Sequence, residues 1–293
     1  MAESGLRGPG AVRTTAGLPL RVRRRLRKAW HFLRSYLPSR RAEALFADVR
    51  TFCMFIGYPR SGHTLVGSLI DAHPNAIVAN ELNIVGHVKR GFSRAQIYTL
   101  ILANSRAFAR KARTWTGYTY AVPNQWQGRF RRLDVIGDKR GAGTVRQLRT
   151  HPELLARLQH TIGTEIRFIH VIRHPLDNIS TISRRHGWPP AKAISYYFAL
   201  CQSVADLKAQ LGTGAVLDVW HEQVIAHPDT AIRQVCAFLG LEPDPDYVRD
   251  CAGIVFAAPR QTREDVVWSL DEREAVRSQA RGFPWLRHYA DES

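Results

Sequence analysis

Short apolar runs alternate with amphipathic segments along residues 52–241. Continuous apolar runs at 52–57, 167–172 and 215–220 predict strands that are buried on both faces, and shorter runs predict strands at 77–79, 117–122 and 131–136. Apolar residues at helical spacing predict helices between them, at 64–72, 94–112, within 144–160, and at 175–186, 190–211 and 228–239. This alternation predicts an α/β fold of three layers, with a central, mostly parallel sheet flanked by helices.

The first 41 residues differ from the rest of the chain. Residues 1–20 are rich in Gly, Ala and Arg without periodicity, which predicts a disordered basic tail. Residues 21–37 place apolar side chains on one helical face and arginines on the other, and Pro38 ends the pattern. We therefore expect a basic amphipathic helix within residues 21–41. Its apolar face either rests on an anionic membrane or packs against the domain formed by residues 50–293.

Charge and cysteine content narrow the function classes. The chain has 42 Lys and Arg against 25 Asp and Glu, a net charge of +17, and the first 41 residues hold a large share of it. A basic body predicts an anionic ligand, which is nucleic acid, an acidic polymer or a phosphorylated cofactor. The four cysteines form no Cys-x-x-Cys pair, so we expect free thiols, a reducing compartment and no metal site. The sequence shows neither a signal peptide nor a membrane-spanning run, which favours a cytoplasmic location.

A glycine-containing loop joins the first predicted strand to the first predicted helix. The residues GYPRSGHT, 57–64, have the spacing of a phosphate loop, with a histidine where that motif has lysine. Backbone N–H groups and the start of a helix together predict an anion site. Four residues would donate these N–H groups: Ser61, Gly62, His63 and Thr64. The missing lysine disfavours Mg-ATP chemistry, and Arg60 supplies the nearest fixed positive charge.

The sequence YPRSGHTLVGSLIDAHP, residues 58–74, resembles the 5′-phosphosulfate-binding loop of sulfotransferases that use 3′-phosphoadenosine 5′-phosphosulfate (PAPS). Its form is especially similar to that of tyrosylprotein sulfotransferases and their bacterial relatives. Residues 219–241, VWHEQVIAHPDTAIRQVCAFLGL, resemble a segment that sulfotransferases share, so the resemblance extends over about 52–241. It implies a P-loop-type fold, PAPS as the sulfuryl donor, a hydroxyl acceptor and no metal.

A second anion site is expected in RHPLDNIST, residues 173–181. An arginine that leaves the carboxyl end of a parallel strand lies on the ligand side of the sheet. The family resemblance implies that Arg173, with a hydroxyl eight residues later, holds the 3′-phosphate of PAPS. Thr181 stands where the family has serine, and Ser180 is the alternative. An ion pair of Arg173 with Asp177 is the structural interpretation of the same residues.

Glu81 is the first candidate for the base that accepts the proton of the acceptor hydroxyl. The resemblance implies this role, because tyrosylprotein sulfotransferases use a glutamate at the same offset from the residue that matches Arg60. Cytosolic sulfotransferases use histidine instead, so His63, His73 and His87 are alternatives. A structural ion pair of Glu81 with a nearby cation is the competing interpretation.

Two cations are candidates for stabilising the leaving group. Arg60 lies inside the loop, where its charge suits a leaving nucleotide phosphate. Lys139 follows the predicted strand 131–136, and the family has a lysine in a comparable place near the transferred sulfonate. Arg140 is a weaker candidate.

Three further segments have less specific signals. Residues 114–132 mix aromatic and basic side chains, and they form either an acceptor groove or a hairpin packed on the core. Residues 280–289 match a segment that lies over the cofactor in some relatives. Glu222, in the segment 219–241, has a structural interpretation only.

Two other function classes compete with a sulfotransferase. The first is a nucleoside or nucleotide kinase of similar architecture, for which Asp218 is the only candidate magnesium ligand in the sequence. The second is a basic nucleic-acid-binding or membrane-binding protein, but the concentration of charge in residues 1–41 argues against a specific nucleic acid. The acceptor is a glycan, a peptide tyrosine or a small alcohol or phenol, and the basic surface favours an acidic one. Nothing in the sequence predicts the oligomeric state.

Overall fold

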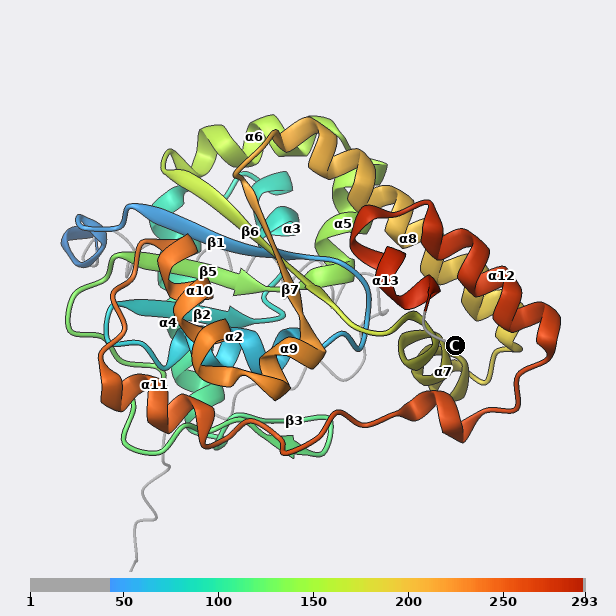
Figure 1. Ribbon diagram of the computed structural model, residues 1–293. Helices are drawn as coiled ribbons and strands as arrows, with labels where there is room; N and C mark the ends of the chain where they lie inside the picture. Colours follow the sequence, from blue (N-terminus) through green and yellow to red (C-terminus); the bar gives the residue numbers. More distant parts are fainter. Residues whose placement is uncertain (1–42, 292–293) are drawn as a thin grey trace, which may run out of the picture.

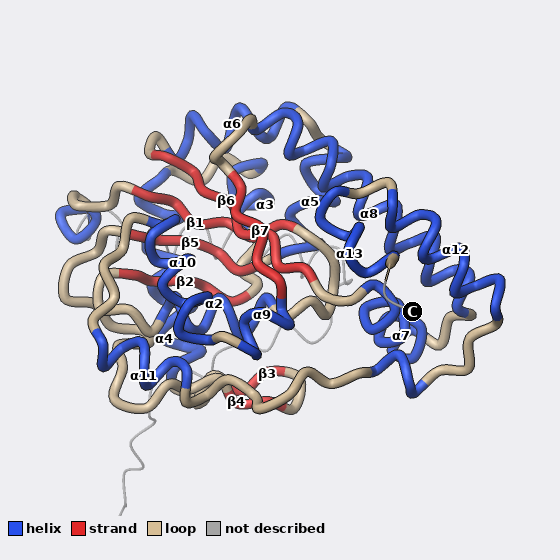
Figure 2. The backbone as a smooth tube through the Cα atoms, in the orientation of Figure 1, coloured by secondary structure: helices blue, strands red, loops and turns tan. Residues whose placement is uncertain are grey.

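The computed structural model describes residues 43–291. Its centre is a five-stranded parallel sheet of order β2-β5-β1-β6-β7, which confirms the predicted α/β architecture (Figures 1 and 2). The strands are β1 (Thr51–Ile56), β2 (Ala76–Asn80), β5 (Val135–Lys139), β6 (Glu165–Ile172) and β7 (Val216–Trp220). Two very short strands, β3 (Thr114–Trp115) and β4 (Tyr118–Thr119), form a separate antiparallel hairpin.

The central strand β1 is buried on both faces. Its alternate side chains enter two different cores: Phe52, Met54 and Ile56 join one apolar cluster, and Cys53 and Phe55 join the other. The first cluster includes side chains from the helices on one side of the sheet, and the second includes those of the helices on the opposite side. This two-sided burial explains why the strand is a continuous apolar run in the sequence.

Helices α3, α5, α6 and α8 belong to the first core, and α2, α10 and α11 belong to the second. Their bounds are α2 (His63–Asp71), α3 (Ile84–Lys89), α4 (Arg94–Ala109), α5 (Gly141–Thr150), α6 (Glu153–Ile162), α7 (Pro175–His186) and α8 (Pro190–Leu211). The C-terminal part contains α9 (His221–Ala226), α10 (Pro228–Leu239), α11 (Pro245–Ala252), α12 (Leu270–Arg281) and α13 (Arg287–Ala290). Short 3₁₀ turns complete it: η1 (Glu43–Phe46), η2 (Thr262–Asp265) and η3 (Pro284–Leu286).

Three predicted elements differ from the structure. The predicted strand at 117–122 is reduced to the two residues of β4, because Thr116 and Gly117 make a tight turn with positive φ and only two residue pairs form. The strand predicted at 131–136 begins and ends later, so Lys139 is its last residue and does not follow it. Gly137 permits this strand to lie against β1, where a Cβ atom would come within 2.1 Å of the Cys53 carbonyl oxygen. Finally, Pro152 divides the region 144–160 between two helices.

The predictions for residues 1–20 and for the amphipathic helix within 21–41 lie outside the described residues. Within residues 43–291, no helix combines the length and apolar character needed to cross a membrane.

Candidate active site

The carboxyl ends of all five parallel strands meet at one cleft. The cleft has a volume of about 780 Å³, and each strand or the loop after it contributes to its wall. The contributions, in chain order of the strands, are Arg60 to Thr64 after β1, Glu81 after β2, Lys139 at the end of β5, Arg173 after β6 and His221 after β7. This is the edge of a parallel sheet at which ligands bind in open α/β folds.

The glycine loop leaves the first turn of α2 open to the cleft. Gly62 is the N-cap residue with φ 98°, and no side chain caps the helix. The first N–H groups of a helix have no partner within the helix, so they remain available to an anion. A side chain at Gly62 is excluded, because its Cβ atom would lie 2.5 Å from Nδ1 of His221.

Two loop residues turn their side chains into the protein. Ser61 is fully buried, its Oγ donates to the Tyr58 carbonyl oxygen at 3.1 Å, and it accepts from Nδ2 of Asn178 at 3.0 Å. Nε2 of His63 donates to the Ile56 carbonyl oxygen at 3.0 Å, and burial lowers the pKa of His63 to about 3. Only the backbone N–H groups of these two residues therefore suit an anion, and the structure disfavours His63 as the base.

Glu81 and Lys139 form an ion pair at the cleft wall. Nζ of Lys139 lies 2.9 Å from Oε1 of Glu81, and Nε of Arg140 lies 3.8 Å from Oε2. The Lys139 side chain is 4% exposed and the Glu81 side chain is 39% exposed. Burial lowers the pKa of Lys139, and the charge of Glu81 opposes that shift. Oε2 is the Glu81 oxygen that Lys139 leaves free for a further ligand.

Asp138 holds the backbone that carries Glu81. Its buried carboxylate accepts hydrogen bonds from the N–H groups of Leu82 at 2.9 Å, Asn83 at 2.9 Å and Ile84 at 3.2 Å. Glu81 itself has φ 57°, an unusual conformation for a residue with a side chain, and its N–H donates to the Lys139 carbonyl oxygen at 3.1 Å. Adjacent residues of β5 thus hold both the backbone and the side chain of Glu81.

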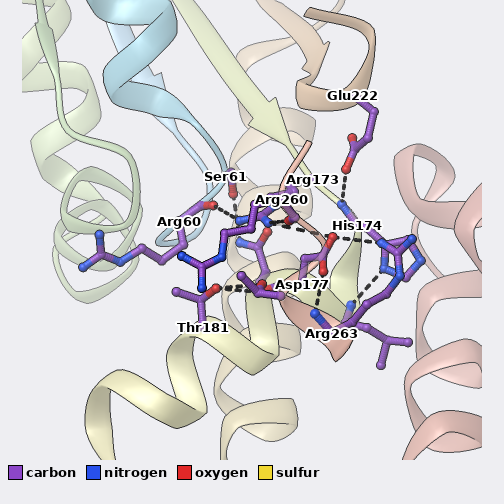
Figure 3. Close-up of polar contacts among 12 residues, drawn as sticks. Arg60, Ser61, Arg173, His174, Asp177, Thr181, Glu222, Arg260 and Arg263 are labelled. Carbon is purple, nitrogen blue, oxygen red and sulfur yellow. Dashed lines mark hydrogen bonds and ion pairs between the residues drawn. The ribbon is translucent and has the colours of Figure 1, made fainter. Parts of the chain in front are cut away.

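Arg173 lies beside the glycine loop, as predicted from its place at the end of β6. Its Nη1 donates to the Arg60 carbonyl oxygen at 3.3 Å, its Nη2 donates to the Arg260 carbonyl oxygen, and Asp177 lies 3.9 Å from Nη2 (Figure 3). Nε of Arg173 is buried and has no hydrogen-bond partner among the described residues. The side chain of Arg60 points away from this cluster, so the two guanidinium groups face different parts of the cleft.

Thr181, and not Ser180, faces the cleft beside Arg173. Oγ1 of Thr181 lies 2.9 Å from the Asp177 carbonyl oxygen and 3.0 Å from Oγ1 of Thr262. Ser180 is fully buried and lies outside the residues that line the cleft. Of the two hydroxyl groups, only that of Thr181 therefore faces the cleft.

His221 is a cleft residue that the sequence analysis missed. It begins α9 directly after β7, its Nδ1 is buried without a partner among the described residues, and burial lowers the pKa of His221 to about 4. Its position in the sequence could have identified it, because His221 directly follows a predicted strand, as Arg173 does, and residues at the carboxyl ends of parallel strands lie on the ligand side of the sheet. Glu222 has the structural role that we expected: Oε1 accepts from the His174 N–H at 2.9 Å and Oε2 accepts from the Tyr289 hydroxyl at 2.6 Å.

The aromatic segment 114–132 lines the cleft with the β3–β4 hairpin. Trp115 and Tyr118 are 41% and 40% exposed and face the cleft. Tyr120 belongs to the second core but also lines the cleft, and Val122 is buried in that core. The Trp115 ring centroid lies 5.8 Å from Nζ of Lys139, and the Tyr118 ring lies 5.5 Å from that of Phe256. Both the hairpin and the groove interpretations therefore describe part of this segment.

Residues 280–289 do not cover the cleft, which corrects the prediction for them. Trp285 is buried instead, and its Nε1 donates to the Tyr58 hydroxyl at 3.2 Å beneath the loop. The loop at 256–262 takes the expected place, since Phe256, Arg260 and Thr262 line the cleft. No signal in the sequence marks this irregular loop.

The two remaining histidine candidates lie away from the cleft. Nε2 of His73 donates to the Glu242 carbonyl oxygen at 3.2 Å, and Nδ1 of His87 lies 2.8 Å from Nη2 of Arg90. Neither residue lines the cleft, so the structure disfavours both as bases. Asp218 is also engaged elsewhere, because it lies 2.9 Å from Nδ1 of His170 and 2.5 Å from Nζ of Lys208.

A family model described as "Sulfotransferase family" matches residues 54–246, about two thirds of the chain. The chain belongs to the sulfotransferase family. The matched range contains the glycine loop, Glu81, Lys139, Arg173 and His221 of this sulfotransferase, whereas the cleft residues of the loop at 256–262 lie beyond it.

One curated relative is "Nodulation protein NoeE" from Sinorhizobium fredii (strain NBRC 101917 / NGR234), 27% identical over 256 residues. The match covers 78% of this chain and 57% of the relative, so the chain spans little more than half the length of that protein. Three solved structures are similar over most of the chain. The first is a sulfotransferase domain from the curacin biosynthetic pathway, with 13% identity, coverage of 80% of this chain and 98% of that chain, and a TM-score of 0.49. The second is STF9 from Mycobacterium avium, with 9% identity, coverage of 86% of this chain and 81% of that chain, and a TM-score of 0.49. The third is mouse SULT7A1 complexed with PAP, with 12% identity, coverage of 84% of this chain and 89% of that chain, and a TM-score of 0.45.

Proposed function

We propose that this sulfotransferase moves a sulfuryl group from PAPS to a hydroxyl acceptor without a metal. One observation supports this most strongly: a single cleft brings the glycine loop, Glu81 and Lys139 together with Arg173 and Thr181. PAPS has two separated anionic ends on one nucleoside, and the cleft offers two separated groups of anion-binding residues. Residues 50–293 would form the catalytic domain.

The residues fit such a donor. The uncapped first turn of α2 and the side chain of Arg60 would hold the 5′-phosphosulfate end. Arg173 and Thr181 would hold the 3′-phosphate, and the buried Nε of Arg173 has a hydrogen left without an acceptor among the described residues. A buried donor without a partner carries a free-energy cost that a phosphate oxygen would remove.

Sulfuryl transfer requires an in-line displacement at sulfur. The acceptor oxygen forms a bond to sulfur while the bond from sulfur to the bridging oxygen breaks, and that electron pair remains on the departing nucleotide phosphate. Arg60, Lys139 and the loop N–H groups would stabilise the charge on this oxygen. The acceptor proton would pass to Oε2 of Glu81, since Lys139 binds Oε1 and leaves Oε2 free.

The same geometry disfavours phosphoryl transfer from Mg-ATP. His63 stands where a phosphate loop has lysine, and its ring donates to the Ile56 carbonyl oxygen beneath the loop. Asp218, the acidic residue considered for magnesium, lies against His170 and Lys208 and outside the cleft lining. The cleft thus provides neither of the groups that hold the outer phosphates and the metal in nucleoside triphosphatases.

Thermal unfolding with two nucleotides tests the proposal. We expect 3′-phosphoadenosine 5′-phosphate (PAP) to raise the melting temperature in the presence of a chelator, and ATP with Mg²⁺ to leave it unchanged. Stabilisation by ATP with Mg²⁺ and not by PAP would support a kinase instead. Incubation with PAPS and a hydroxyl acceptor should then give a product heavier by one sulfuryl group.

A further inference from the structure

The cleft contains more arginines than carboxylates can neutralise. Among residues 43–291, its wall includes eight cationic side chains and a single carboxylate, that of Glu81. The cations are Arg60, Lys139, Arg140, Arg146, Arg173, Arg184, Arg185 and Arg260. Such an excess at a concave surface predicts an anionic occupant.

Five of these cations have a carboxylate nearby. Glu81 forms ion pairs with Lys139 and Arg140, and Oδ2 of Asp177 lies 3.9 Å from Nη2 of Arg173. Asp265 pairs with Arg184 and lies 3.4 Å from Arg260. Among the described residues, no ion pair involves the other three, Arg60, Arg146 and Arg185.

Arg146 and Arg185 come from two helices that pack against the same third helix. Arg146 lies on α5 and Arg185 lies in the last turn of α7, and α5 and α7 both contact α8. Nη1 of Arg146 lies 3.4 Å from the hydroxyl of Tyr196 on α8. The positive charge of Arg185 also reaches the reacting end of the cleft, because it lowers the pKa of Arg60 in addition to burial.

The donor does not account for these two arginines. Its sulfuryl end would engage Arg60 and Lys139, and its 3′-phosphate would engage Arg173 and Thr181. Arg185 lies one helical turn beyond Thr181, and Arg146 lies on the helix that follows Lys139. Both line the cleft outside the residues assigned to the donor, and the charges of Arg185 and Glu81 both act on the pKa of Arg60.

The surroundings of Glu81 suit a saccharide ring better than a phenol. Arg140 lies 3.8 Å from Glu81, and the cleft residues that follow Arg140 are small: Gly141, Ala142 and Gly143. The exposed ring of Trp115 offers a flat apolar surface above Lys139. A phenol would need a largely apolar pocket, whereas a sugar combines one apolar ring face with several hydroxyl groups.

We propose that the acceptor is an acidic saccharide, whose carboxylate or phosphate group is bound by Arg146 and Arg185 while its hydroxyl lies at Glu81. This proposal rests on the proposed sulfotransferase function. It adds a binding site for a charged group of the acceptor, distinct from the residues that bind the donor. Guanidinium groups match the planar oxygens of a carboxylate or the oxygens of a phosphate.

The test compares matched acceptors that differ in one charge. Oligosaccharides of glucuronic acid and of galacturonic acid are each offered with PAPS as the free acid and as the methyl ester, which has the same ring hydroxyl groups. Glucose 6-phosphate and glucose form the phosphate pair. We expect at least one acidic member to exceed its neutral partner about tenfold or more in kcat/KM, as is typical of charge-assisted hydrogen bonds. The pair that shows the preference identifies the carboxylate or the phosphate.

Variants assign the preference to the two arginines. Arg146→Gln and Arg185→Gln should each reduce the ratio of acidic to neutral turnover, with PAP affinity within about twofold of the original. Arg233→Gln, an exposed arginine on α10 outside the cleft lining, should leave the ratio unchanged. If PAP stabilises the protein but no acidic member is preferred, including the case in which no saccharide is sulfated, this inference is wrong and the proposed function stands. If PAP does not bind, the proposed function is contradicted, and the inference about the acceptor is contradicted with it.

Discussion

The carbonyl oxygen of Arg60 accepts a hydrogen bond from Nη1 of Arg173 at 3.3 Å, although 113 positions separate the two residues. The contact arises because β1 and β6 are parallel neighbours in register, so their carboxyl ends lie side by side. The loop that would hold the sulfuryl end of the donor is thus attached to the arginine that would hold its other end. The two proposed anion sites therefore lie next to each other in one cleft.

Arg60→Gln should lower turnover about 100-fold or more, because it removes a cation that faces the leaving oxygen in the transition state. PAP affinity should change much less, since the loop N–H groups and Arg173 remain. Turnover with labelled PAPS and calorimetric titration with PAP separate the two effects. Unchanged turnover would exclude Arg60 as the leaving-group cation.

Glu81→Gln should reduce kcat on the order of 100-fold, because an amide of the same size does not accept a proton from the acceptor. Glu81→Asp, which keeps the charge on a shorter side chain, should retain more activity than Glu81→Gln. PAP affinity should remain close to that of the original protein in both variants. If Glu81→Gln weakened PAP binding as strongly as turnover, Glu81 would have a structural role.

Asp138→Asn should lower kcat and change the pH profile. Burial raises the pKa of Asp138 to about 6, so its carboxylate becomes protonated as the pH falls through that value and accepts fewer N–H groups from the Glu81 segment. We therefore expect activity to fall below about pH 6. Asparagine does not titrate, so this acidic decline should weaken in the variant while PAP affinity is retained. An identical pH profile in both proteins would remove Asp138 from the positioning of Glu81.

His63 should make the folded protein less stable in mild acid. Burial lowers its native pKa to about 3, whereas in the unfolded chain the histidine has its ordinary pKa of 6.5. Below pH 6.5 the unfolded state binds a proton that the native state does not, so the free energy of unfolding decreases as the pH falls. The decrease approaches about 1.4 kcal/mol per pH unit well below pH 6.5, and well above pH 6.5 this histidine contributes no pH dependence.

His63→Asn isolates that contribution. Urea denaturation at pH 6.5 and pH 5.5 should show a loss of stability that is smaller in the variant by about 1 kcal/mol. Comparison of the two proteins cancels the other titrating groups. Equal losses would show that His63 is protonated in the native state.

The sequence predicted the sheet and several residues that line the cleft because strand ends and apolar runs are local features. The apolar runs that became β1 and β6 located the glycine loop and Arg173. The strand β5 was displaced in the prediction because Gly137, Asp138 and Lys139 do not resemble a buried strand, although all three are buried. Its polar residues are tolerated because they hold the Glu81 segment.

The remaining parts of the site depend on tertiary contacts that sequence periodicity does not reveal. The loop at 256–262 has no regular pattern, yet Arg260 and Thr262 contact Arg173 and Thr181. The C-terminal segment contained a resemblance to residues that cover a cofactor, but Trp285 packs beneath Tyr58. His221 lies against Gly62 through a contact between the ends of β7 and β1, which are not adjacent strands.

Calorimetric titration with PAP and with 5′-AMP, in a metal-free buffer, tests the central claim that one nucleotide spans both anion sites. We predict that PAP binds at least about tenfold more tightly than 5′-AMP. Thr181→Val and Arg173→Gln should each weaken PAP binding while changing the affinity for 5′-AMP by no more than about twofold. Equal affinities for the two nucleotides, or variants that weaken both to the same extent, would contradict the claim.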